Sequence, residues 1–158
     1  MKQKAKTYAF FIIFTLAVGG LSALLTMGNM DIYEKIETPP FAPPSIVFPI
    51  AWGILYVLMG LSAAMVYIKG KEEGINTFGA LSLYFAQLAV NFFWSIIFFN
   101  MQNFLFAFIW LLLLLVLVLL QTRAFYAVDK RAAYLQIPYI AWLVFAAVLN
   151  YSVFMLNV

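Results

Sequence analysis

Five long apolar runs, separated by short polar segments, dominate the pattern of the chain. They are Tyr8–Met27, Ile46–Ile68, Phe78–Phe99, Phe104–Leu120 and Ala132–Val158. A helix rises about 1.5 Å per residue, so about 20 residues cross a hydrocarbon core about 30 Å thick. The fourth run is shorter but strongly apolar, and its flanks can extend it. Because lipid leaves backbone polar groups unsatisfied, the pattern predicts an all-α integral membrane protein, a bundle of five transmembrane helices in one domain.

The composition agrees with this prediction and excludes several kinds of catalytic and metal-binding site. The chain of 158 residues is 66% hydrophobic and 9% charged, whereas soluble domains are about 25% charged. It contains no cysteine and no histidine, which excludes disulfides, thiol catalysis, zinc sites and histidine-ligated haem. We therefore expect no metal site and no required cofactor.

The charged residues predict the orientation of the bundle. Eight of the nine Lys and Arg residues fall in the N-terminus and in the second and fourth loops, on one side of the membrane. The positive-inside rule then places the N-terminus in the cytoplasm and the C-terminus outside the cell membrane. We attribute the net charge of +3 to the cations that orient the helices in the membrane, so we expect no nucleic-acid partner. A signal peptide at the N-terminus is the alternative, but its apolar run is too long and lacks a clear cleavage site.

The longest loop, Gly28–Ser45, carries prolines at positions 39, 40, 43 and 44. Prolines fix the backbone, so the sequence predicts a stiff, extended loop without helix on the outer side. It can be a solvated connector or a lid over the bundle. Tyr33 and Phe41 are apolar anchors that a connector does not need, which favours a lid.

No carboxylate falls within a predicted span. The six are Asp31, Glu34, Glu37, Glu72, Glu73 and Asp129. Ion-coupled transporters and enzymes with carboxylate pairs need such groups inside their sites, so both classes are disfavoured. No conventional catalytic constellation is present.

The remaining polar and aromatic residues form stripes at helical spacing on four of the predicted helices. The stripes are Thr15, Gly19, Ser22 and Thr26; Trp52, Tyr56 and Gly60; Gln87, Asn91 and Trp94; and Tyr139, Trp142, Ala146 and Asn150. Each stripe alone is typical of helix packing or of interfacial aromatic belts. Because they converge at one depth beneath the loop, we favour an aromatic-walled pocket. Pro138 is expected to kink the fifth helix, and the kink either widens such a pocket or only shapes the packing of the helices.

Four motifs on these stripes and on the loop resemble the TspO/MBR family, also called translocator protein or peripheral benzodiazepine receptor. They are PPFAPP at 39–44, WGILYVLMG at 52–60, QLAVNFFWSIIFF at 87–99 and PYIAWLVFAAVLNYSVFMLN at 138–157. The resemblance implies a homodimer of five-helix bundles, each with a ligand cavity roofed by the first loop. It also implies binding of tetrapyrroles such as protoporphyrin IX and of benzodiazepine-site ligands, with light-dependent oxidative porphyrin degradation in some members. A transporter of porphyrins or similar amphipaths, and a ligand-sensing regulatory protein, are the alternatives.

The resemblance also implies roles for particular residues. Trp52 and Trp142 match the two pocket tryptophans, which we expect to assist photo-oxidation. The full set expected to bind ligand is Ser22, Tyr33, Phe41, Pro43, Trp52, Tyr56, Gln87, Asn91, Trp94, Trp142, Ala146 and Asn150. The macrocycle would stack among Trp52, Trp94 and Trp142, as flat aromatic ligands do.

The sequence departs from the family pattern at three places. Phe41 stands where many members have tryptophan, and the proline before the second-helix tryptophan is displaced to Pro49. No basic residue follows Tyr151, so the sterol motif of animal members is incomplete.

Overall fold

The computed structural model describes residues 1–158, which form helices without any strand. The elements are α1 (Lys2–Thr26), η1 (Met27–Asn29), α2 (Ile32–Lys35), α3 (Val47–Glu73), α4 (Phe78–Ser95), η2 (Ile96–Asn100), α5 (Phe104–Val128), α6 (Lys130–Tyr134) and α7 (Ile137–Leu156). They give five helical segments long and apolar enough to cross a membrane. The predicted all-α membrane bundle of five helices is confirmed.

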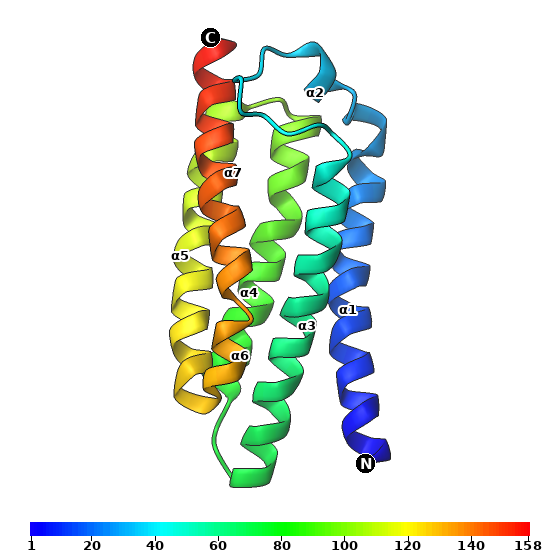
Figure 1. The fold of residues 1–158 in the computed structure, drawn as a ribbon, viewed down its shortest axis with the longest axis vertical. Helices are drawn as coiled ribbons and strands as arrows, with labels where there is room; N and C mark the ends of the chain where they lie inside the picture. Colours follow the sequence, from blue (N-terminus) through cyan, green and yellow to red (C-terminus); the bar gives the residue numbers. More distant parts are fainter.

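The five segments stand side by side, and the two termini lie at opposite ends of the bundle (Figure 1). Helix α1 packs mainly on α3, α4 on α5, and α5 on α7. The α1–α3 connection, with α2, crosses the end of the bundle that carries the C-terminus (Figure 1). We call this end the loop end. Large apolar side chains such as Leu24, Ile54 and Val116 are exposed along the outer sides of the spans, where lipid would cover them.

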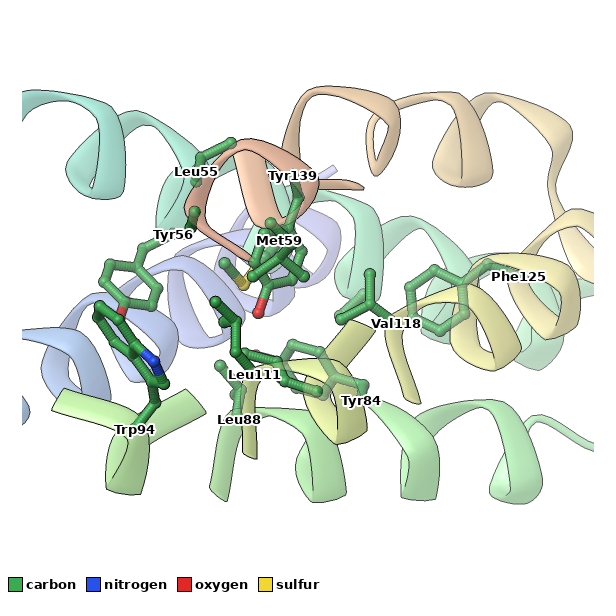
Figure 2. Close-up of a cluster of buried hydrophobic side chains, with 14 of the residues drawn as sticks. Leu55, Tyr56, Met59, Tyr84, Leu88, Trp94, Leu111, Val118, Phe125 and Tyr139 are labelled. Atoms are coloured by element: carbon green, nitrogen blue, oxygen red, sulfur yellow. The ribbon is translucent and has the colours of Figure 1, made fainter. Parts of the chain in front are cut away.

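A layer of buried side chains joins the helices below the loop end. Met59, Tyr84, Leu111 and Tyr139 are fully buried in it. Tyr56 and Trp94 come at one end of this group of side chains and Phe125 at the other (Figure 2). The cluster therefore extends from the region under the loop toward the opposite end of the bundle.

Close approach of α1 and α3 depends on two glycines. A Cβ added at Gly60 would lie 2.6 Å from the Cα of Ile12 and 2.7 Å from the carbonyl oxygen of Phe11. On α1, the ring of Tyr56 occupies the space where Gly19 lacks a side chain, since an added Cβ would lie 2.2 Å from its Cε2. Small residues allow two membrane helices to approach to backbone contact in this way.

The helices extend beyond the apolar runs from which they were predicted. Helix α5 continues to Val128 instead of ending near Leu120, and α3 continues to Glu73. The helix ends therefore carry charged side chains, and the Nζ of Lys4 lies 2.5 Å from Glu72 Oε1. A helix does not end where its apolar face ends, because its terminal turns can project into water while their backbone bonds persist.

The prediction that no helix forms between Gly28 and Ser45 is wrong for the first part of this loop. Helix η1 continues α1 to Asn29, and α2 forms one further turn. A proline restricts only itself and the residue before it, so Pro39 cannot prevent a turn that ends at Lys35. The proline segment itself is non-helical.

Pro138 ends one helix and starts another instead of kinking a continuous one. Helix α6 ends at Tyr134, and α7 begins with Pro138 in its first turn. Proline has no N–H to donate to the carbonyl of Tyr134, and its ring disfavours helix in the residue before it. The break therefore falls at Leu135–Gln136, before the proline.

The end of α4 departs from α-helical geometry. Residues Ile96–Asn100 form a π-helical segment, a feature often found near functional sites. Asn100 Nδ2 donates to the carbonyl of Leu25 at 3.0 Å, and Asn29 Nδ2 donates to Asn100 Oδ1 at 2.9 Å. These bonds join α4 to the end of α1 just below the loop.

Candidate ligand-binding cavity

A cavity of about 540 Å³ lies at the loop end, among α1, α3, α4 and α7 and beneath the α1–α3 connection. Most of its lining is apolar. The lining residues are Gly19, Ser22, Ala23, Met30, Asp31, Tyr33, Glu34, Ser45, Ile46, Phe48, Pro49, Trp52, Tyr56, Trp94, Ser95, Phe98, Phe99, Trp142, Ala146, Leu149 and Asn150. Its volume falls within the range of about 300–1,000 Å³ that is common for small-molecule sites.

Three tryptophans from three helices form the wall of the cavity. The ring of Trp52 on α3 lies 6.4 Å from Trp94 on α4 and 6.3 Å from Trp142 on α7, centre to centre. Tyr56, one turn after Trp52, stacks on it with ring centres 5.6 Å apart. Edge-to-face and offset contacts of this kind hold large rings in fixed positions. The cavity therefore presents a continuous aromatic surface centred on Trp52.

The polar groups of the wall are largely bonded to the protein itself. Ser22 donates to the carbonyl of Phe92 at 3.0 Å, and Trp94 Nε1 donates to Asn150 Oδ1 at 3.2 Å. Asn150 Nδ2 donates in turn to the carbonyl of Phe104 at 2.8 Å. The buried Nε1 of Trp142 is an exception, because it has no hydrogen-bond partner. The interior of the cavity thus offers few free donors.

A chain of hydrogen bonds forms the floor of the cavity. Tyr56 Oη donates to Asn91 Oδ1, Asn91 Nδ2 donates to Tyr139 Oη, and Tyr139 Oη donates to Gln87 Oε1, each at 2.8 Å. Gln87 Nε2 lies 3.8 Å from the sulfur of Met59. We call Tyr56, Asn91, Tyr139 and Gln87 the floor network. It satisfies amides and hydroxyls that lipid could not, and it joins α3, α4 and α7.

The loop is tied down over the cavity. Tyr33 Oη donates to the carbonyl of Pro43 at 3.0 Å, and its ring lies 5.0 Å from that of Phe48. Partial burial raises the pKa of the Tyr33 hydroxyl above its ordinary value. At the other edge, Glu37 N donates to Asn157 Oδ1 at 3.0 Å and Asn157 Nδ2 donates back to the Glu37 carbonyl at 2.8 Å. The loop is therefore held over the bundle at two places, near Tyr33 and at Glu37.

Most exposed residues of the lining belong to the loop, and we call these the rim: Met30, Asp31, Glu34, Ser45 and Ile46. Ala23 on α1 and Pro49 on α3 are the other exposed lining residues. Asp31 forms an ion pair with Lys35 one turn later. The hydrogen bond and the charge of Lys35 hold the pKa of Asp31 below its ordinary value. No Lys or Arg residue lines the cavity.

The structure brings eight of the predicted ligand-binding residues to this cavity. They are Ser22, Tyr33, Trp52, Tyr56, Trp94, Trp142, Ala146 and Asn150.

Four other predicted residues do not line the cavity. Gln87 and Asn91 are buried beneath it, because the tyrosines of the floor network use their hydrogen-bonding groups. Phe41 is 49% exposed and its ring lies 6.4 Å from that of Phe145. Pro43 lines a separate groove with Trp142 and Phe145. In this structure these four residues therefore lie outside the cavity lining, and their contact with a ligand stays a prediction.

Other lining residues were not anticipated from the sequence. Phe98 follows Trp94 by four residues and Leu149 follows Ala146 by three, so helical spacing could have found both. Phe99 follows Trp94 by five, and its place in the lining coincides with the π-helical segment. The apolar part of the cavity is therefore larger than the stripes predicted.

Comparison with known proteins shows the family of the chain. The profile of the TspO/MBR family matches residues 11–156. The chain belongs to the TspO/MBR family. It is 34% identical to the tryptophan-rich protein TspO of Archaeoglobus fulgidus over 147 residues, which cover 92% of this chain and 94% of that protein.

Relatives of this TspO/MBR chain extend from bacteria to mammals. It is 32% identical to protein CrtK of Rhodobacter capsulatus, over 95% of this chain and 92% of that protein. It is 39% identical to the human translocator protein over 124 residues, or 77% of this chain and 72% of that protein. The chain is thus an integral membrane protein of this family, and its cavity lies within the matched residues.

Proposed function

We propose that this protein is a membrane receptor that binds tetrapyrroles, with protoporphyrin IX as the test ligand, in the cavity at the loop end. Benzodiazepine-site ligands would occupy the same space. The aromatic wall centred on Trp52 carries the proposal, because a flat macrocycle needs large, rigid apolar surfaces on which to stack. The proposal includes a homodimer, which rests on the sequence resemblance and which light scattering of the purified protein would measure.

Light-dependent oxidation of a bound porphyrin is part of the same proposal. An excited porphyrin in the presence of dioxygen generates oxidising species, and the indoles of Trp52 and Trp142 would be among the first groups they meet. The chemistry would then belong to the ligand, and the protein would position it.

Binding is expected to depend on Trp52 and Trp142. Replacing Trp52 by alanine should weaken binding of protoporphyrin IX roughly 5- to 150-fold, since loss of an aromatic stacking partner costs about 1–3 kcal/mol. Trp142→Ala should also weaken it, and the phenylalanine variants should retain more affinity than the alanine variants. Absorbance titration of purified protein with protoporphyrin IX measures these constants, and illumination measures the loss of the porphyrin spectrum.

Trp110→Phe is the matched control. Trp110 lies on α5 away from the cavity and donates to the carbonyl of Val90 at 2.7 Å. It should leave both affinity and light-dependent porphyrin loss unchanged. If Trp52 and Trp142 variants behave like this control, the cavity is not the porphyrin site.

The orientation in the cell membrane is also proposed, with the N-terminus cytoplasmic and the C-terminus outside. The chain has no cysteine, so single cysteines report accessibility without background. A membrane-impermeant maleimide should label Val158→Cys in intact cells, and Gln3→Cys only after the cells are permeabilised. The reverse pattern would place the loop end, and the cavity, in the cytoplasm.

A further inference from the structure

The charges at the loop end are unequally distributed. This end carries Asp31, Glu34 and Glu37 but only one cation, Lys35, since the other Lys and Arg residues belong to α1's first turns and to the opposite end of the bundle. Two of its carboxylates, Asp31 and Glu34, line the rim of the cavity. A ligand that enters past the rim therefore meets negative charge.

Lys35 does not offset this charge completely. Its ammonium group is engaged with Asp31 in an i, i+4 ion pair. Glu34 has no ion-pair partner in the structure and its side chain is exposed. The rim thus keeps one uncompensated negative charge, at Glu34.

The interior of the cavity offers an anionic group no cation, and its one buried unpaired donor is the indole N–H of Trp142. Its walls are mainly apolar, and the groups of Ser22, Trp94 and Asn150 are already bonded within the protein. An ionised carboxylate placed there would lose its hydration without gaining a cation, which is strongly unfavourable. A charged substituent on a ligand must therefore stay at the rim, within reach of Glu34.

From this we infer that the rim selects ligands by charge: Glu34, with Asp31, disfavours macrocycles that carry carboxylates and favours the same macrocycles with neutral or cationic substituents. The inference rests on the proposed tetrapyrrole site and narrows its ligand class. It makes Glu34 a specificity-determining residue at the mouth of the cavity.

The test compares one macrocycle in three charge states against variants of Glu34. The ligands are protoporphyrin IX with two ionised propionates, its neutral dimethyl ester, and a bis-amide carrying two ammonium groups. Glu34→Gln should tighten binding of protoporphyrin IX by about fivefold, as expected for removing a like charge about 4 Å away in water. Glu34→Lys should tighten it further, leave the ester unchanged and weaken the bis-ammonium compound.

Salt provides a second readout. Because the Debye length falls from about 10 Å at 0.1 M to about 3 Å at 1 M, added salt should tighten binding of protoporphyrin IX to the unmodified protein and weaken that of the bis-ammonium compound. For each ligand, we compare the ratio of its dissociation constant for a variant to that for the unmodified protein. This ratio cancels differences in how the three ligands partition into detergent. Glu73→Gln, which removes a carboxylate at the opposite end of α3, should change no ratio.

The outcomes separate this inference from the proposed function. If none of the three ligands binds, the tetrapyrrole site itself is wrong. If all bind but the Glu34 variants behave like Glu73→Gln, the site stands and charge selection at the rim is wrong. If Lys35→Met weakens protoporphyrin IX while Glu34→Gln has no effect, the rim attracts carboxylates through Lys35, which also overturns the inference.

Discussion

Replacing Gly60 by alanine is expected to destabilise the protein by about 2–3 kcal/mol, the upper part of the range for overpacking. The new methyl group would lie 2.6 Å from the Cα of Ile12 and 2.9 Å from its nitrogen. Backbone atoms cannot rotate away as a side chain can, so α1 and α3 would have to separate. Thermal unfolding of the purified protein in detergent, followed by circular dichroism, would show a lower midpoint.

Gly53 on the same helix is the matched control. An alanine there meets nothing within 4 Å, and it improves the helix propensity of the chain. The midpoint of Gly53→Ala should therefore stay equal or rise. Equal midpoints for the two variants would mean that α1 and α3 do not pack at this distance in the folded protein.

The spans were predictable because the bilayer imposes strong rules on sequence. Length and hydropathy decide whether a segment crosses, and the backbone must then be helical. Helical spacing also predicted that Trp52, Trp94 and Trp142 share one region, and the structure places all three on one cavity. Both results follow from the helical spacing of residues and from their position along an apolar run, and both can be read from the sequence.

The floor network could not be predicted in the same way. Spacing shows that Gln87, Asn91 and Trp94 share a face of α4, but it does not show where along that face the cavity ends. Tyr56 and Tyr139 come from other helices and lie 2.8 Å from the two amides. Gln87 and Asn91 were expected to contact a ligand, but in the structure they form a buried layer with these tyrosines. Which polar groups pair with each other depends on packing between helices.

The details of the loop and of the helix ends escaped prediction for a different reason. Proline rules act on one or two residues, so they predicted neither α2 nor the position of the break before Pro138. The π-helical segment has no signature in the apolar pattern of Ile96–Asn100. These features nevertheless shape the site, since α2 positions Tyr33 and Glu34 at the cavity.

A leucine in place of Asn91 is expected to lower both stability and ligand affinity. Tyr56 Oη would lose its acceptor and Tyr139 Oη its donor, and both hydroxyls are buried. Hydrogen bonds between membrane helices contribute about 0.6 kcal/mol each, so the loss of two of them sets the lower end of the effect. An unsatisfied buried polar group costs about 1–3 kcal/mol, which sets the upper end. We therefore expect a loss of about 1–3 kcal/mol, seen as a lower unfolding midpoint.

The effect on affinity should follow from the position of Tyr56. Its ring lines the cavity and stacks on Trp52 with centres 5.6 Å apart. Without a partner for its hydroxyl, the ring would rotate toward the cavity, where the hydroxyl can be solvated. The ring would then fill part of the volume that the ligand needs. Titration with protoporphyrin IX should then show binding weakened by about tenfold, equivalent to about 1.4 kcal/mol.

Gln87→Leu separates stability from binding. It removes the acceptor of Tyr139 but leaves the bond from Tyr56 to Asn91 intact. Its unfolding midpoint should also fall, though by less than that of Asn91→Leu because only one buried hydroxyl loses a partner, whereas its affinity for protoporphyrin IX should stay near that of the unmodified protein. Equal losses of affinity in both variants would show that the floor network supports the cavity only through overall stability. Loss of affinity in Gln87→Leu alone would mean that Gln87, and not Tyr56, meets the ligand.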